Sequence, residues 1–174
     1  MNTDSGASRR VPAVTTVTSI GGDAVRDISR ALTALTADMF ALHIKTKSFQ
    51  WHVSGAHCLD YGRLLREQAG QILATADATA ERARALGGST LRSISHILRL
   101  QRVMDNDADY MTPSDMLAEL RDDNAQVASR LLEAHGLCWE YRDVATASLI
   151  QNWAGEAEGR ARFLSDVTRN GESE

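Results

Sequence analysis

Apolar residues recur at steps of three and four along four long stretches of the chain. This spacing places their side chains on one face of an α-helix. It predicts helices over about 23–53, 59–87, 113–138 and 144–167, each roughly 25–30 residues long and about 40 Å in length. Four such helices form a bundle. The apolar stripes are Val25, Ile28, Leu32, Leu35, Met39 and Leu42; Leu65, Ala69, Ile72, Ala76, Ala80 and Ala83; Leu117, Leu120, Val127, Leu131, Ala134 and Cys138; and Ile150, Trp153, Ala157, Leu164 and Val167.

Helix-breaking and helix-capping residues mark the ends of these stretches. We expect Asp23 to cap the first helix and Ser54–Gly55 to end it. Gly87–Gly88 end the second helix, because glycine readily adopts the left-handed conformation found after helix C-termini. The third helix has Thr112 at its cap and Pro113 at its first position, where the missing N–H group of proline is no loss.

The connection between the second and third helices, residues 88–111, is long for a helical bundle. Inside it, the segment Thr90–Val103 is itself amphipathic, with Ile94, Ile97 and Leu98 among its apolar residues. This pattern predicts a short crossing helix. Its apolar face exceeds what one bundle needs, so we expect it to pack on another subunit.

Composition limits the class of protein. The 174 residues fit one domain, and a hydrophobic fraction of 43% is enough for a real core. We expect a flexible N-terminal arm over 1–20, one domain over 21–170 and a tail over 171–174. The two cysteines, Cys58 and Cys138, are too few for a disulfide scaffold, and no apolar run is long enough to cross a bilayer. A cytoplasmic protein with reduced thiols is the simplest interpretation.

Several local segments together resemble one family over nearly the whole chain. They are Lys45–Gly55, Asp77–Arg82 followed by Leu86–Gly88, Leu91–Ile94, Asp105–Asp107 and Asp143–Thr146. The chain is similar in these segments to the Dps (DNA-protection-during-starvation) family of ferritin-like proteins. The resemblance implies an all-α, ferritin-like four-helix bundle with a short extra helix in the middle connection. It also implies a hollow homo-oligomer of twelve subunits with two-fold interfaces, which oxidises Fe(II), usually with peroxide, and stores ferric mineral.

The iron site of that family lies at the two-fold interface. One subunit contributes a His before a Trp of the first helix and a His-x-x-x-Asp on the second; its partner contributes an Asp-x-x-x-Glu. The resemblance assigns Asp77 and Glu81 as retained ligands, whereas Gln50, Gly62 and Arg66 stand at the other three positions. An amide oxygen is a poor iron ligand, glycine offers none, and a guanidinium repels a metal cation. The resemblance therefore implies iron, but weak binding at this site, and no organic cofactor is evident.

Arg66 is the most informative of these substitutions. In the family geometry its side chain would face Asp77 and Glu81 of the neighbouring subunit, and arginine matches carboxylates in bidentate fashion. Our hypothesis is that an intersubunit ion pair replaces the metal; if partly buried, loss of one partner would cost about 3–5 kcal/mol. The alternative is a solvated acidic edge in which Glu81 pairs with Arg84.

Other residues leave alternatives open. A relocated metal site built from His43, His52 or His57 is one alternative, although turn hydrogen bonds and packing explain these residues equally well. Trp51, next to the site, is expected to pack in the core or an interface. Asp143 stands where relatives line their ion-entry pores, but a helix cap explains it too.

Three functions follow from these features. The first is an iron-storing cage with impaired ferroxidase activity, either alone or co-assembled with an active relative. The second is an active ferroxidase with a rebuilt site. The third is a DNA-protecting or structural shell, with a nucleoid location. The net charge of -4 and an arm with one basic pair, Arg9–Arg10, indicate weak or absent DNA binding.

Overall fold

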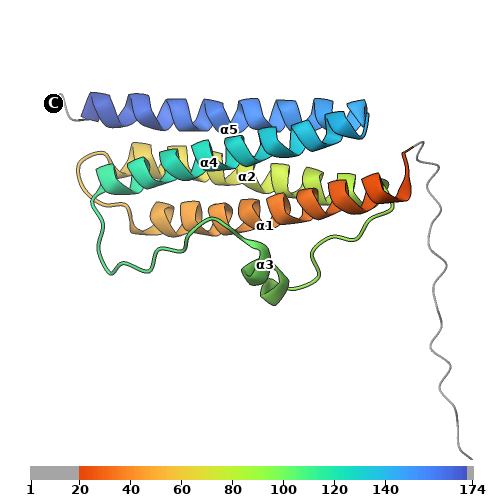
Figure 1. Ribbon diagram of the computed structural model, residues 1–174. Helices are drawn as coiled ribbons and strands as arrows, with labels where there is room; N and C mark the ends of the chain where they lie inside the picture. Colours follow the sequence, from red (N-terminus) through yellow and green to blue (C-terminus); the bar gives the residue numbers. More distant parts are fainter. Residues whose placement is uncertain (1–19, 172–174) are drawn as a thin grey trace, which may run out of the picture.

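Four long helices run side by side in this computed structural model, which describes residues 20–171 (Figure 1). They are α1 (Gly22–His52), α2 (Cys58–Ala85), α4 (Pro113–Glu140) and α5 (Val144–Gly171), and the short α3 (Ile94–Leu100) lies between α2 and α4 in the chain. α1 packs along α2 and α4 packs along α5, while α1 also contacts α4. The all-α four-helix bundle with an extra helix in the middle connection is therefore confirmed.

The apolar stripes form the core between the four helices. Ile28, Leu32, Met39 and Leu42 of α1 are fully buried, and the predicted stripe of α4 is buried along its whole length. Three stripe residues lie at the margin of this core, because Val25, Ala80 and Val167 are only partly covered. The core thus explains why these four segments fold as long helices and pack together.

The predicted helix ends are mostly confirmed. Gly55 and Gly87 have φ angles of 102° and 89°, which favour glycine, and they follow the ends of α1 and α2. Thr112 Oγ1 accepts a hydrogen bond of 3.1 Å from the backbone N–H of Asp115 at the start of α4. The prediction for Asp23 is wrong: Gly21 occupies the cap position, and Asp23 lies in the first turn. There its carboxylate accepts a hydrogen bond of 2.7 Å from Arg26 Nη1.

The crossing helix α3 is shorter than the amphipathic segment that predicted it. Ser93 caps the start of this helix, since its hydroxyl accepts a hydrogen bond of 3.2 Å from the N–H of His96. Ile94 is 84% exposed and Leu98 65% exposed, so residues 20–171 leave the apolar face of α3 uncovered. Its packing on another subunit stays a prediction.

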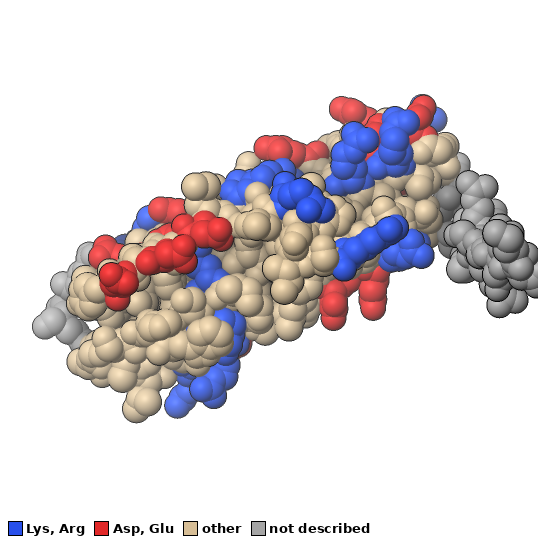
Figure 2. Space-filling model, turned by 90° about the horizontal axis from the view of Figure 1, so that it is seen from below, with Lys and Arg blue, Asp and Glu red and all other residues tan. Residues whose placement is uncertain are grey.

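Charged side chains form small, separate groups on the face of the molecule that is seen from below relative to Figure 1. Figure 2 shows basic and acidic side chains on this face with uncharged surface between them. Among the described residues on this face, the basic side chains do not merge into one continuous patch. The predicted arm, with Arg9 and Arg10, lies outside the described residues apart from Ile20. At the other end, α5 continues through Gly171, the first residue of the predicted tail.

Between residues 20 and 171, no helix combines the length and the apolar character needed to cross a membrane.

Candidate functional site

One outward face of α2 carries four of the predicted site residues. Arg66, Asp77 and Glu81 are exposed and Gly62 is partly covered, whereas Leu65 and Ile72 on the opposite face are fully buried. Steps of four residues keep Gly62 with Arg66, and Asp77 with Glu81, on the same side of the helix. The two pairs therefore lie on one surface of α2.

The positions of these residues are symmetric about the middle of α2. Arg66 precedes Asp77 by eleven residues, which is three turns and about 16 Å along the helix. Gly62 lies four residues before Arg66, and Glu81 lies four residues after Asp77. A two-fold axis through the middle of α2 would place Arg66 opposite Asp77 of a second copy. The same axis would place Gly62 opposite Glu81.

Within residues 20–171, Arg66, Asp77 and Glu81 form no hydrogen bond or ion pair with their own chain. The pair of Glu81 with Arg84, which belonged to the alternative of a solvated acidic edge, is not formed among the described residues: Arg84 Nη1 donates to the carbonyl of Gly88 at 2.6 Å. That carbonyl follows the end of α2, where a cation is favourable. The acidic pair therefore presents both carboxylates on the surface of the chain.

Gln50 and Trp51, near the end of α1, share a lysine. Lys47 Nζ donates a hydrogen bond to Gln50 Oε1, and it lies 5.5 Å from the centroid of the Trp51 ring. Trp51 is 64% exposed, so it does not pack in the core of this chain. The amide oxygen at position 50 is thus bound to a cation. An amide oxygen is a poor iron ligand and a guanidinium repels a metal cation, so neither Gln50 nor Arg66 is suited to hold iron. That these two residues stand at ligand positions of the family stays a prediction.

Comparison with known proteins decides the family. A family model described as Ferritin, a ferritin-like domain, matches residues 29–173. The chain belongs to the ferritin-like family. A low-temperature-induced protein from a Nostoc species is 30% identical over 129 residues, which are 74% of this chain and 72% of that protein. DNA protection during starvation protein 1 from Deinococcus radiodurans is 25% identical over 127 residues, 73% of this chain and 61% of that protein.

A solved structure agrees with this assignment at the level of the fold. The Dps protein of Vibrio cholerae superposes with a TM-score of 0.82 over 90% of this chain and 98% of its own, at 18% identity. That protein is described as a member of a broad superfamily of ferritin-like diiron-carboxylate proteins. The resemblance to Dps proteins seen in the sequence is therefore confirmed for the fold and the family.

The histidines considered for a relocated site contact different partners in this ferritin-like chain. His43 Nδ1 is 2.9 Å from the carbonyl oxygen of Ala69, and His52 Nδ1 is 2.7 Å from that of Ser48. Because a carbonyl only accepts, both Nδ1 atoms are donors. His57 lies beside the Tyr61 ring, with ring centroids 5.9 Å apart. In the described part of the chain, no three His, Cys, Asp or Glu side chains are grouped so as to hold a metal.

Asp143 caps α5 from a buried position. Its Oδ1 accepts hydrogen bonds from the backbone N–H of Thr146 at 3.0 Å and from Arg82 Nη2 at 3.3 Å, and its side chain is 6% exposed. Arg82 Nε also donates to the Thr146 hydroxyl at 2.8 Å. The helix-cap interpretation is confirmed, and the three residues join α2 to α5. A role in an ion-entry pore stays a prediction.

Two buried charges on α1 were not predicted from the sequence. Asp38 is fully buried, and Lys45 is 7% exposed. Lys45 Nζ lies 2.8 Å from Glu119 Oε1 and 2.7 Å from Asp123 Oδ2 of α4. Burial opposes the charge of the amine, but the two carboxylates outweigh it and raise the pKa of Lys45.

A signal for these buried charges was present in the sequence. Leu35, Asp38, Leu42, Lys45 and Phe49 follow one another at steps of three and four, so both charges occupy positions of the apolar stripe. A charge at such a position requires a buried partner of opposite sign. The partner itself comes from another element and is not visible in the pattern.

Proposed function

We propose that this protein is a subunit of a Dps-like cage that holds ferric iron. We further propose that an ion pair of Arg66 with Asp77 and Glu81 replaces the ferroxidase centre at its two-fold interface. Membership in the ferritin-like family supports the iron-binding part of this proposal. The similarity to the Deinococcus DNA protection protein and to the Vibrio Dps structure supports a Dps-like assembly.

The observation that carries the proposal is the symmetric arrangement on α2. Arg66 and Asp77 share one outward face, three turns apart, and neither is paired within the described chain. A second α2 packed antiparallel across a two-fold axis gives Arg66 and Asp77 of each copy a partner of opposite charge on the other copy. Such a contact is self-complementary. The guanidinium then meets the carboxylates of the other copy in the bidentate geometry that arginine favours.

The charges at this interface work against Fe(II) binding. Arg66 contributes one positive charge, and Lys47 places a second one beside Gln50. With only Asp77 and Glu81 as carboxylates, the site offers too few ligands for a pair of iron ions. Iron stored by such a cage is oxidised elsewhere, either in solution or by an active relative in a mixed cage.

The first experiment measures iron oxidation directly. Fe(II) is added to the assembled, metal-free protein with hydrogen peroxide as oxidant, and ferric absorbance is followed against a protein-free control. We expect an initial rate no faster than that of buffer. A clear protein-dependent rate that disappears with Asp77→Ala and Glu81→Ala would show that the acids still bind iron, and would overturn the proposal.

A gain-of-function variant gives the sharper test. The combined changes Gln50→His, Gly62→His and Arg66→Asp rebuild the ligand set of the family pattern. A side chain fits at position 62, since a Cβ built on Gly62 meets no other atom within 4 Å. Bound iron offsets the repulsion between the new carboxylate at position 66 and Asp77 of the other copy, so we expect this variant, assembled with Fe(II), to oxidise Fe(II) faster than buffer.

The control for that variant carries the same three changes together with Asp77→Ala and Glu81→Ala. We expect it to lose the restored rate, because the partner half of the site is then missing. If the triple variant assembles normally but oxidises Fe(II) no faster than the unmodified protein, the assignment of these positions to a former iron site is wrong.

A further inference from the structure

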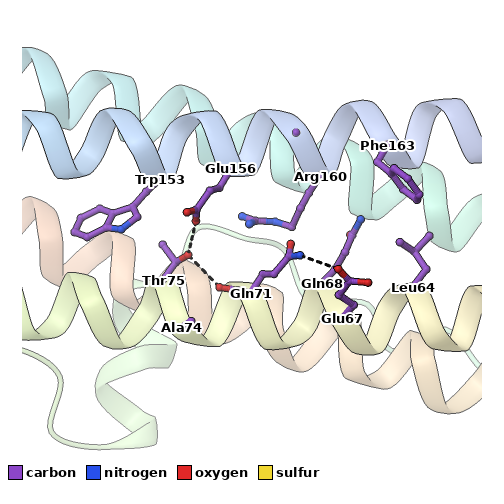
Figure 3. Close-up of a pocket in the computed structure, with 11 residues that line it drawn as sticks. Leu64, Glu67, Gln68, Gln71, Ala74, Thr75, Trp153, Glu156, Arg160 and Phe163 are labelled. Atoms are coloured by element: carbon purple, nitrogen blue, oxygen red, sulfur yellow. Dashed lines mark hydrogen bonds between the residues drawn. The ribbon is translucent and has the colours of Figure 1, made fainter.

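A cavity of about 600 Å³ lies between α2 and α5, on a different side of α2 from the Arg66 face. Figure 3 shows Trp153, Glu156, Arg160 and Phe163 projecting from α5 into the space between α5 and α2, where Gln68 of α2 also lies. Its wall is partly apolar and aromatic, with a few polar side chains. Such a combination is typical of a small-molecule site.

Arg160 is the basic residue among those that line this cavity. It is only 4% exposed, and its Nε donates to Asn124 Oδ1 of α4 at 2.8 Å. Its two terminal nitrogens, Nη1 and Nη2, have no hydrogen-bond partner among the described residues. Burial lowers the pKa of Arg160, although the nearby Glu156 carboxylate opposes this effect. A buried guanidinium with unmet donors is unfavourable, and an anion that accepts from it relieves the penalty.

The acidic groups at the cavity make other contacts. Glu156 Oε2 accepts a hydrogen bond of 3.4 Å from the Thr75 hydroxyl, and Glu67 Oε1 accepts one of 3.4 Å from Gln71 Nε2 (Figure 3). Gln68 Oε1 is buried without a partner within the described residues, so a second polar group is also unsatisfied. The wall therefore combines one unsatisfied cation, one unsatisfied acceptor and two carboxylates.

We propose that this cavity binds a small apolar molecule that bears one carboxylate. The carboxylate accepts from the terminal nitrogens of Arg160, and the apolar body lies against Trp153 and Phe163. A doubly charged anion such as phosphate is disfavoured, because Glu67 and Glu156 would repel it and the aromatic rings would offer it nothing. Both terminal nitrogens are covered, so the carboxylate reaches them only when a flexible side chain of the wall changes rotamer.

The proposal is independent of iron oxidation, since it concerns another face of α2 and its measurement is binding. The assembled, full-length protein is titrated by calorimetry with 3-phenylpropionate as the probe. 3-Phenylpropionamide, its neutral isostere, and inorganic phosphate serve as controls. We expect saturable binding of 3-phenylpropionate, at least about tenfold weaker binding of the amide, and no binding of phosphate.

Two glycines of α5 provide a matched pair of variants. Gly159 lines the cavity and Gly155 does not, and a Cβ built at either position meets nothing within 4 Å. We expect Gly159→Leu to abolish binding by filling the cavity and Gly155→Leu to leave it unchanged. We expect Arg160→Gln to weaken binding about tenfold or more, if the variant folds.

Three outcomes would overturn the proposal whether or not Arg160→Gln folds. They are no saturable binding of 3-phenylpropionate, equal binding of this acid and its amide, and a Gly159→Leu variant that binds the acid as tightly as the parent protein does. Saturable binding of phosphate in place of the apolar acid would likewise overturn it, because the site would then recognise anions without the apolar contact.

Discussion

Asp38 and Arg102 are joined by three hydrogen bonds, although 64 residues separate them in the chain. Asp38 Oδ1 accepts from the backbone N–H of Arg102 at 2.6 Å, and Oδ2 accepts from Arg102 Nε at 3.0 Å and Nη2 at 2.6 Å. Arg130 of α4 approaches the same carboxylate at 3.5 Å. One buried side chain of α1 thereby fixes the segment that follows α3.

Replacing Asp38 by Ala should lower the free energy of unfolding by about 3 kcal/mol, because two arginines then lose their common acceptor. This value is at the lower end for a buried pair, since the Arg102 side chain is 42% exposed. Chemical unfolding at fixed chain concentration measures the change, and hydrogen exchange over 101–111 should accelerate. Arg26→Ala, which removes only exposed pairs, should change little. Equal stability of the Asp38 variant and the parent would contradict the prediction.

Gly88→Ala should destabilise the protein by about 2 kcal/mol, because the added methyl group has no room. A Cβ at this position would lie 2.1 Å from Ser29 Oγ and 3.1 Å from the carbonyl oxygen of Ala83. The melting temperature measures the loss, and Ser29→Gly in the same chain should recover part of it. Gly136→Ala, at an exposed position of α4 with open space, should instead stabilise by about 1 kcal/mol. A Gly88 variant as stable as the Gly136 variant would show that the close approach is absent.

Ionisation of the Cys138 thiol should lower the free energy of unfolding at alkaline pH. Burial raises the pKa of this thiol to about 12, and the Asp143 carboxylate adds to the rise. Above pH about 8.5 the unfolded chain releases this proton while the folded chain keeps it, so the free energy of unfolding decreases as pH rises. One such group contributes a slope of about 1.4 kcal/mol per pH unit.

Unfolding curves at pH 9 to pH 11 should therefore show a shallower decline for Cys138→Ala than for the parent protein. Cys58→Ala is the matched control, because Cys58 is only partly covered. In thiol labelling of the folded protein at pH 8, we expect modification of Cys58 and not of Cys138. Rapid labelling of Cys138 without unfolding would contradict its burial.

Arg66→Ala should weaken assembly. Two equivalent contacts meet at the proposed two-fold interface, so the loss should be about 3 kcal/mol per interface. Size-exclusion chromatography over a range of chain concentrations should show smaller species for the variant. Added salt should likewise weaken the assembly of the parent protein. Arg162→Ala, an exposed arginine of α5, should leave the distribution unchanged.

Charge reversal separates a direct pair from a general charge effect. Arg66→Asp alone should disrupt assembly more than Arg66→Ala, and the combination with Asp77→Arg should restore it. Failure of the double reversal to improve on Arg66→Asp would mean that these two positions do not meet across the interface.

The family resemblance assigned the positions of the candidate site, and helical spacing puts Gly62, Arg66, Asp77 and Glu81 on one face of α2. The described residues leave that face open, and its identity as a former iron site stays a prediction. The histidines were harder to interpret, because the partner of His43 is a backbone carbonyl 26 residues away. The assignment of Asp23 failed for a local reason: Gly21 precedes it in an extended conformation and takes the cap position.

The sequence by itself determined the four long helices, most of their ends and the apolar faces that join them. These features depend on spacing and on the conformational preferences of single residues such as Gly87 and Thr112. Only the tertiary structure decided which partners the buried charges meet. Asp38 with Arg102, Lys45 with Asp123, and Arg160 beside its cavity depend on chain segments brought together by packing, and no local pattern encodes that proximity.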